Sequence, residues 1–179
     1  ATSGIGQETA IGLAKMGAQV IITGRNRQRG EAAVSEIKQA SGNPKVDLMI
    51  ADMTSQADIE CLADDVIARY PRLDVLVNNV GMVVNTRQMT VDGIELNFAV
   101  NHLAPFLLIH RLLPLLQRSA PARVVNVTGG ILGKVDLTNL QAEKGSYVGF
   151  FNYSHSKSIL MVASYEFAQR LKGTGVTVN

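Results

Sequence analysis

The feature that most constrains this chain is the regular alternation of short apolar runs with longer amphipathic segments. The runs VIIT (20–23), DVLV (74–77) and RVVNV (123–127) are apolar almost throughout. Strands buried on both faces of a parallel sheet have this continuous apolar character, whereas antiparallel strands with one solvated face alternate. Strand and helix patterns that repeat about every thirty residues therefore indicate a parallel α/β fold.

The expected fold is a doubly wound, Rossmann-like parallel sheet in three αβα layers, formed as a single domain over residues 1–179. No strand precedes the first helix, and the last strand is cut short, so we expect the natural polypeptide to extend at both ends. The pattern predicts helices over 5–16, 28–40, 55–70, 91–117 and 152–172, and strands over 18–24, 45–52, 73–81, 122–130 and 175–179.

Composition narrows the classes of partner. The formal charge of +2 is spread along the chain, which argues against a nucleic-acid partner. No apolar run reaches the roughly 18 residues of a membrane span, so we expect a cytoplasmic protein with a small-molecule partner. Cys61, the single cysteine, lies among apolar neighbours and predicts a buried thiol. Histidines and carboxylates lack ligand spacing, so no metal site is expected.

A glycine turn opens the chain. In TSGIG (2–6), Gly4 and Gly6 lie where the turn enters a helix, so backbone N–H groups and the positive end of the helix dipole face outward. A phosphate group fits such a site, although glycines at a helix start can also serve only the turn. The position favours a nucleotide, because an α/β sheet binds one at this point.

Arginines follow the next strand. Arg25 and Arg27 occupy the place where a site for unphosphorylated adenosine ribose would carry an acidic residue. A guanidinium suits a 2′-phosphate, which favours NADP over NAD. The alternative is that both arginines are simply solvated.

A tyrosine and a lysine lie one helical turn apart in YSHSK (153–157). A lysine cation beside Tyr153 favours the phenolate and lowers the tyrosine pKa from about 10, as a general acid/base requires. The spacing alone also occurs by chance.

In combination these motifs resemble the short-chain dehydrogenase/reductase superfamily, because TSGIG, AD (51–52), NNVG (78–81), VNHLAPF (100–106) and YSHSK occur in the order that family uses. The segments around VNHLAPF and VVNVTG (124–129) look most like its retinol dehydrogenase branch. The resemblance implies catalysis by Tyr153 with Lys157 as its partner and with Asn101 fixing a proton-relay water. It also implies that the cofactor contacts Ser3, Gly4, Ile5 and Gly6 at the pyrophosphate, Arg25 at the 2′-phosphate, Asp52 and Met53 at the adenine, and Asn78, Val80 and Gly81 along the central strand.

The sequence departs from the family where a serine normally holds the substrate oxygen. An ungapped match places Thr128 one residue before that position and Gly129 at it. Three alternatives follow: Thr128 supplies the hydroxyl, Tyr153 holds the oxygen alone, or activity is lost. Val80 also stands where alanine is usual.

The predicted function is an NADP-dependent oxidoreductase that interconverts a carbonyl and an alcohol on an apolar substrate, with Tyr153, Lys157, Asn101 and Thr128 as catalytic residues. The alternative is an impaired, nucleotide-binding regulatory or scaffold protein. The resemblance further implies a homo-oligomer, because members of this family commonly assemble into dimers or tetramers.

Overall fold

The computed structural model describes residues 1–129 and 135–179. Helices and strands alternate along the chain, and the paired strands run parallel, which confirms the α/β class and the parallel pairing. Residues Ala1–Asp52 and Met53–Asn179 form two compact units, each with a sheet of its own, and we describe them in turn. The grouping of all strands into one domain stays a prediction.

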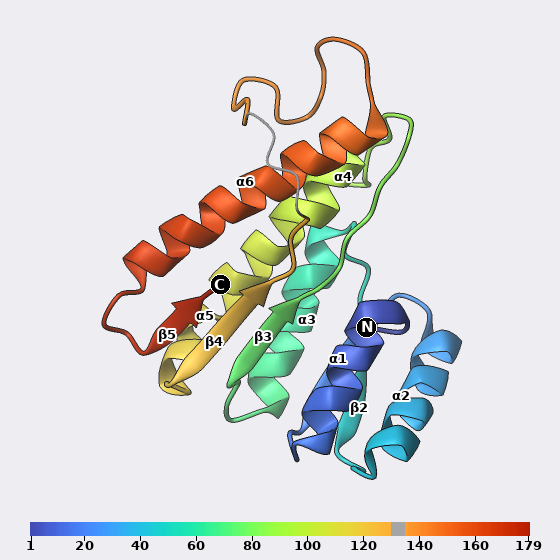
Figure 1. Cartoon of the computed structure of the whole chain (residues 1–179), viewed down its shortest axis with the longest axis vertical. Helices are drawn as coiled ribbons and strands as arrows, with labels where there is room; N and C mark the ends of the chain where they lie inside the picture. Colours follow the sequence, from blue (N-terminus) through green and yellow to red (C-terminus); the bar gives the residue numbers. More distant parts are fainter. Residues whose placement is uncertain (130–134) are drawn as a thin grey trace. The chain divides into compact units, whose positions relative to one another are not determined.

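In the first unit, two helices pack beside a two-stranded parallel sheet (Figure 1). Gly30 brings the second helix close to the sheet, because a Cβ there would stand 2.6 Å from Cδ1 of Leu48. The core is formed by small and branched apolar side chains, among them Ala10, Ala14, Ile22, Ala33, Ile37 and Val46. The elements are α1 (Gly4–Lys15), β1 (Val20–Gly24), α2 (Arg27–Ser41) and β2 (Val46–Ile50), close to the predicted ranges.

In the second unit, the sheet has the order β3-β4-β5 (Figure 1). Helix α5 packs on β3 and β4, α3 packs against α5, and α6 packs on β4 and β5. The elements are α3 (Gln56–Arg69), β3 (Val75–Asn78), α4 (Leu96–Phe98), the π-helical turn η1 (Ala99–Leu103), α5 (Ala104–Arg118), β4 (Ala122–Asn126), α6 (Gly149–Arg170) and β5 (Val176–Val178). Gly130, at the end of one predicted strand, lies outside the described residues.

The helix predicted over 91–117 begins at Leu96 instead. Gly93 has a positive φ of 72° in a turn closed by Thr90, and the Glu95 carboxylate accepts hydrogen bonds from the N–H groups of Asn97 and Phe98. By length and composition alone, the continuous helical stretch Leu96–Arg118 is long and apolar enough to cross a membrane, although no such segment was predicted. However, 61% of the most apolar 18-residue part of this stretch is buried inside the structure, as in the core helix of a globular domain.

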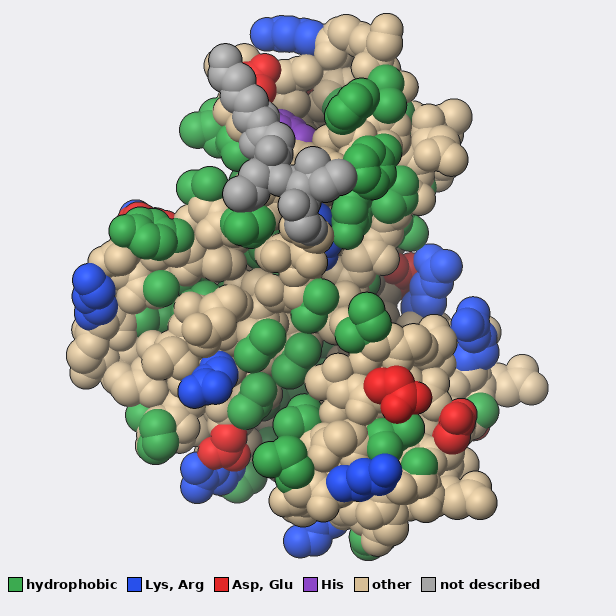
Figure 2. Space-filling view, in the orientation of Figure 1, with side chains coloured by type: hydrophobic (Ala, Val, Ile, Leu, Met, Phe, Trp, Pro, Cys, Tyr) green, Lys and Arg blue, Asp and Glu red, His purple; other side chains and the backbone are tan. Residues whose placement is uncertain are grey.

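The prediction of a buried Cys61 was wrong, because its thiol is exposed. The core-facing stripe of α3 is formed by Ile59, Leu62, Ala63 and Val66, and Cys61 points away from that stripe. On the face shown in Figure 2, the lysine and arginine side chains of the described residues are scattered rather than gathered into one patch.

Candidate active site

The start of α6 positions Tyr153 and Lys157. The helix begins at Gly149, three residues before the predicted start, where a Cβ would stand 2.3 Å from the carbonyl oxygen of Val84. Only glycine permits this approach, so the first turn of α6 rests directly on the backbone that follows β3. Tyr153 and Lys157 follow one and two turns later, with Tyr153 half-buried and Lys157 buried.

The Lys157 ammonium group lies between two backbone carbonyls. Its Nζ atom donates to the oxygen of Val80 at 3.3 Å and to that of Val127 at 2.9 Å, and the residue is only 3% exposed. Burial lowers the pKa of Lys157, because desolvation disfavours the charged form. Two of the three ammonium donors are used in this way, which fixes the direction of the third.

Gly81 lies against the same ammonium group. A Cβ on Gly81 would stand 3.5 Å from Nζ of Lys157 and 3.7 Å from Oδ1 of Asn101. The end of β3, the helix η1 and the helix α6 therefore meet at this point. Asn78 and Val80, which precede Gly81, were also predicted to line the cofactor. The carbonyl of Val80 accepts from Lys157, and the side-chain amide of Asn78 donates to Oδ1 of Asn126 at 2.8 Å.

Asn101 is fully buried within the π-helical turn. Its Oδ1 accepts from the N–H of Met82, and its Nδ2 donates both to the carbonyl of Met82 and to Oγ of Ser156. The side chain thus connects η1 to the segment after β3 and to the residue beside Lys157. Pro105 has no N–H, so it cannot donate the usual α-helical hydrogen bond to the Asn101 carbonyl.

Gly129 faces the tyrosine. A Cβ on Gly129 would stand 3.4 Å from the Tyr153 hydroxyl, which is ordinary van der Waals contact. A side chain at position 129 would therefore lie beside the Tyr153 hydroxyl. Thr128, the neighbouring residue, is half-buried, and its catalytic role stays a prediction.

The first unit holds the predicted phosphate site. Ser3 precedes α1 but makes no side-chain capping hydrogen bond, and the first turn of the helix contains no acidic residue. The N–H groups of Gly4, Ile5 and Gly6 therefore have no partner within the helix, and the dipole favours an anion. At the end of β1, a Cβ on Gly24 would stand 2.9 Å from Cγ2 of Thr2, so the glycine turn lies beside this strand.

The remaining predicted cofactor residues lie at the ends of strands. Arg25 is exposed and directly follows β1, as a residue that binds a 2′-phosphate would. Asp52 ends the first unit and Met53 begins the second, and both are half-buried. Their contacts with the adenine stay a prediction.

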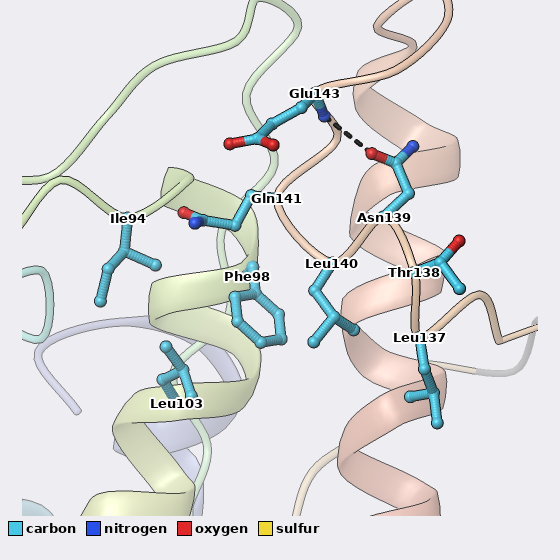
Figure 3. Close-up of a pocket in the computed structure, with 9 residues that line it drawn as sticks. All are labelled: Ile94, Phe98, Leu103, Leu137, Thr138, Asn139, Leu140, Gln141 and Glu143. Carbon is cyan, nitrogen blue, oxygen red and sulfur yellow. Dashed lines mark hydrogen bonds between the residues drawn. The ribbon is translucent and has the colours of Figure 1, made fainter.

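Sequence reasoning missed a polar group next to this site. Glu95, Asn97 and Tyr147 form partly buried hydrogen bonds between the start of α4 and the segment before α6. Beside them a pocket of about 380 Å³ lies between α4 and residues 137–143 (Figure 3). No local pattern marks these residues, because their partners are about fifty positions away in the sequence.

The chain matches known proteins along its whole length. The family model of the short chain dehydrogenases matches residues 1–179. Retinol dehydrogenase 12 of Bos taurus is 43% identical over 99% of this chain and 56% of its own length, and the Mus musculus protein of that name is 41% identical over the same shares.

Among solved structures, an RhlG/NADP active-site complex from Pseudomonas aeruginosa has a TM-score of 0.78 and 32% identity, over 99% of this chain and 67% of that one. The chain spans about half the length of the curated relatives it matches. It belongs to the short-chain dehydrogenase/reductase family, in the branch that includes the retinol dehydrogenases.

Proposed function

We propose that this chain forms the catalytic core of an NADP(H)-dependent oxidoreductase that interconverts a carbonyl and an alcohol on a small, apolar substrate. The observation that carries the proposal is the arrangement at the start of α6. There Tyr153 lies one turn before a buried Lys157 cation, and that cation is held by the carbonyls that follow β3 and β4.

Donor groups at two places in the chain suit parts of a phosphorylated dinucleotide. In the first unit, the uncapped turn at Ser3, Gly4, Ile5 and Gly6 suits a pyrophosphate, and Arg25 suits a 2′-phosphate. We keep Asp52 and Met53 at the adenine, and Asn78, Val80 and Gly81 along the cofactor. The similarity to RhlG, solved with NADP, supports this choice. When bound, the nicotinamide supplies or accepts the hydride at the substrate carbon.

Tyr153 acts as the general acid/base. During reduction its hydroxyl donates a proton to the carbonyl oxygen as that oxygen gains charge, and during oxidation its phenolate removes the proton of the alcohol. The carbonyl oxygens of Val80 and Val127 hold the Lys157 ammonium group, so its positive charge stays one helical turn from Tyr153. The proton and the hydride together convert the carbonyl to the alcohol.

Asn101 would hold the relay water through its backbone. Its side-chain amide is already used by Met82 and Ser156, whereas its carbonyl lacks a donor from Pro105. We assign the water to this carbonyl, from which a proton would reach Tyr153 through Lys157. Widened π-helical turns of this kind are common at functional sites.

The substrate oxygen needs a second donor. Gly129 has no hydroxyl, so we assign this role to Thr128, the next hydroxyl along the same segment. An apolar substrate is supported by Val148, Phe150 and Phe151, which are exposed at the start of α6, and by the retinol dehydrogenase relatives. A cytoplasmic location and a homo-oligomer remain part of the prediction.

The alternative function is a nucleotide-binding regulatory or scaffold protein, which the missing hydroxyl at Gly129 favours. NADPH oxidation by the full-length protein over a panel of apolar aldehydes and ketones separates the two functions. We expect turnover that falls by at least about a hundredfold in Tyr153→Phe and is unchanged in Tyr165→Phe, an exposed tyrosine of the same helix. NADPH binding without tyrosine-dependent turnover would support the alternative.

A further inference from the structure

A buried carboxylate organises the start of α4. Glu95 is 2% exposed, and its Oε1 atom accepts from the N–H of Asn97 at 2.9 Å while its Oε2 atom accepts from that of Phe98 at 2.8 Å. Oε1 also accepts from the hydroxyl of Tyr147 at 2.7 Å. A buried carboxylate is costly unless it is hydrogen-bonded in this way, so the three donors hold Glu95 in one position.

Tyr147 connects this carboxylate to Asn97. Its hydroxyl oxygen accepts from Nδ2 of Asn97 at 2.6 Å while its proton goes to Glu95. Burial, together with the neighbouring Glu95, raises the pKa of Tyr147, so the hydroxyl remains a donor throughout the neutral range. Tyr147 lies two residues before Gly149, where α6 begins.

Asn97 extends the contact to the segment that follows β3. Its Oδ1 accepts from the N–H of Val84 at 3.2 Å, one helical turn before Asn101 makes the same kind of bond to Met82. The two asparagines therefore hold alternate residues of one backbone segment. The start of α6 rests on that segment as well, through the contact of Gly149 with Val84.

We propose that Glu95, Asn97 and Tyr147 form a positioning clamp for the reaction: they fix the start of α6 on the 82–84 segment and so set the direction of the Tyr153 hydroxyl. The clamp reaches Tyr153 only through α6 and the backbone of residues 82–84. Gln141 joins the clamp to the pocket of Figure 3, because its Oε1 accepts from the N–H of Glu95 at 3.1 Å. This inference rests on the proposed function for its kinetic effect, but not for its structural one.

The test is Tyr147→Phe in the full-length protein, with Tyr165→Phe as the matched control. Loss of the hydroxyl removes one donor from Glu95 and leaves Nδ2 of Asn97 with only its long hydrogen bond of 3.5 Å to the carbonyl of Val84. Because a small misplacement of a catalytic group is costly, we expect kcat to fall about tenfold, with KM for NADPH unchanged within about twofold. Amide hydrogen exchange over residues 149–157 should become at least about tenfold faster in the NADPH-free protein.

Asn97→Ala completes the test. If the clamp acts as one unit, the double variant with Tyr147→Phe loses no more activity than the worse single variant. Unchanged exchange over 149–157 in Tyr147→Phe would overturn the clamp, even in a protein without turnover. Faster exchange with unchanged kcat would overturn its role in the reaction. An inactive wild-type protein that still shows the exchange effect would refute only the proposed oxidoreductase function.

Discussion

The hydroxyl of Tyr153 lies 3.4 Å from the point at which a Cβ on Gly129 would stand. This distance places the open space left by the glycine directly beside the proposed acid/base. A hydroxyl introduced at Gly129 would therefore share the substrate oxygen with Tyr153.

The first prediction is that Gly129→Ser raises activity. A preorganised donor on the developing oxyanion contributes about a hundredfold or more in related chemistry, so we expect kcat to rise about tenfold to a hundredfold. The contact of 3.4 Å accommodates the new Cβ without displacing Tyr153. Initial rates of NADPH oxidation measure the change.

Gly12→Ser is the matched control for this gain. Gly12 lies in α1 with no atom within 4 Å of its added Cβ, so its rate should equal that of the wild type. A folded Gly129→Ser protein with unchanged or lower kcat would show that the substrate oxygen is held elsewhere.

The second prediction concerns Thr128. Thr128→Val keeps the shape of the side chain but removes its hydroxyl, and we expect kcat to fall by at least about tenfold. In the Gly129→Ser background the same change should matter less, because the new serine replaces the donor. Equal losses in both backgrounds would contradict the role assigned to Thr128.

The third prediction concerns cofactor choice. Arg25→Asp removes the charge proposed to meet the 2′-phosphate and adds a carboxylate that can accept from a ribose hydroxyl. Because a hydrogen bond to a charged group is worth about 1.5–3 kcal/mol, Kd for NADPH should rise about tenfold or more while Kd for NADH falls.

Arg29→Asp, a second exposed arginine in the same run, serves as the control for Arg25. Fluorescence titration with both cofactors gives the two constants for each variant. If Arg25→Asp leaves the ratio of the Kd for NADPH to the Kd for NADH unchanged, Arg25 does not determine cofactor specificity.

Local sequence patterns predicted most strands and helices of both units, because the apolar pattern of a strand or helix depends on residues that are close together in the sequence. They also placed Tyr153 and Lys157 one turn apart on a helix. The late start of the helix at Leu96 followed from Gly93 and the Glu95 cap, which the apolar pattern of that region hides. The clamp at Tyr147 could not be predicted, because it joins side chains about fifty residues apart.

The fourth prediction is a dependence of stability on His102. This imidazole is 8% exposed, with Phe98 stacked on it and Phe106 tilted against it, and burial lowers its pKa from 6.5 to about 4. Between those two values the unfolded chain binds a proton that the folded chain does not. Stability from this group is therefore lost as the pH falls from 6.5 to about 4, by roughly 3 kcal/mol in full.

His102→Phe should remove this part of the pH dependence, because a phenyl ring fits the same stack without titrating. Urea unfolding at pH 7 and pH 4.5 measures the difference, with the exposed His110→Gln as the control. Parallel pH profiles for the wild type and His102→Phe would show that His102 titrates normally in the folded protein.

Isotope labelling follows the proposed hydride transfer directly. The full-length protein is given NADPH that carries deuterium at both C4 positions of the nicotinamide, together with an apolar aldehyde, and the alcohol product is examined by mass spectrometry. We expect one deuterium at the former carbonyl carbon of the product, and we expect Tyr153→Phe to form this product at least about a hundredfold more slowly. An unlabelled product, or labelled product formed equally fast without the Tyr153 hydroxyl, would contradict it.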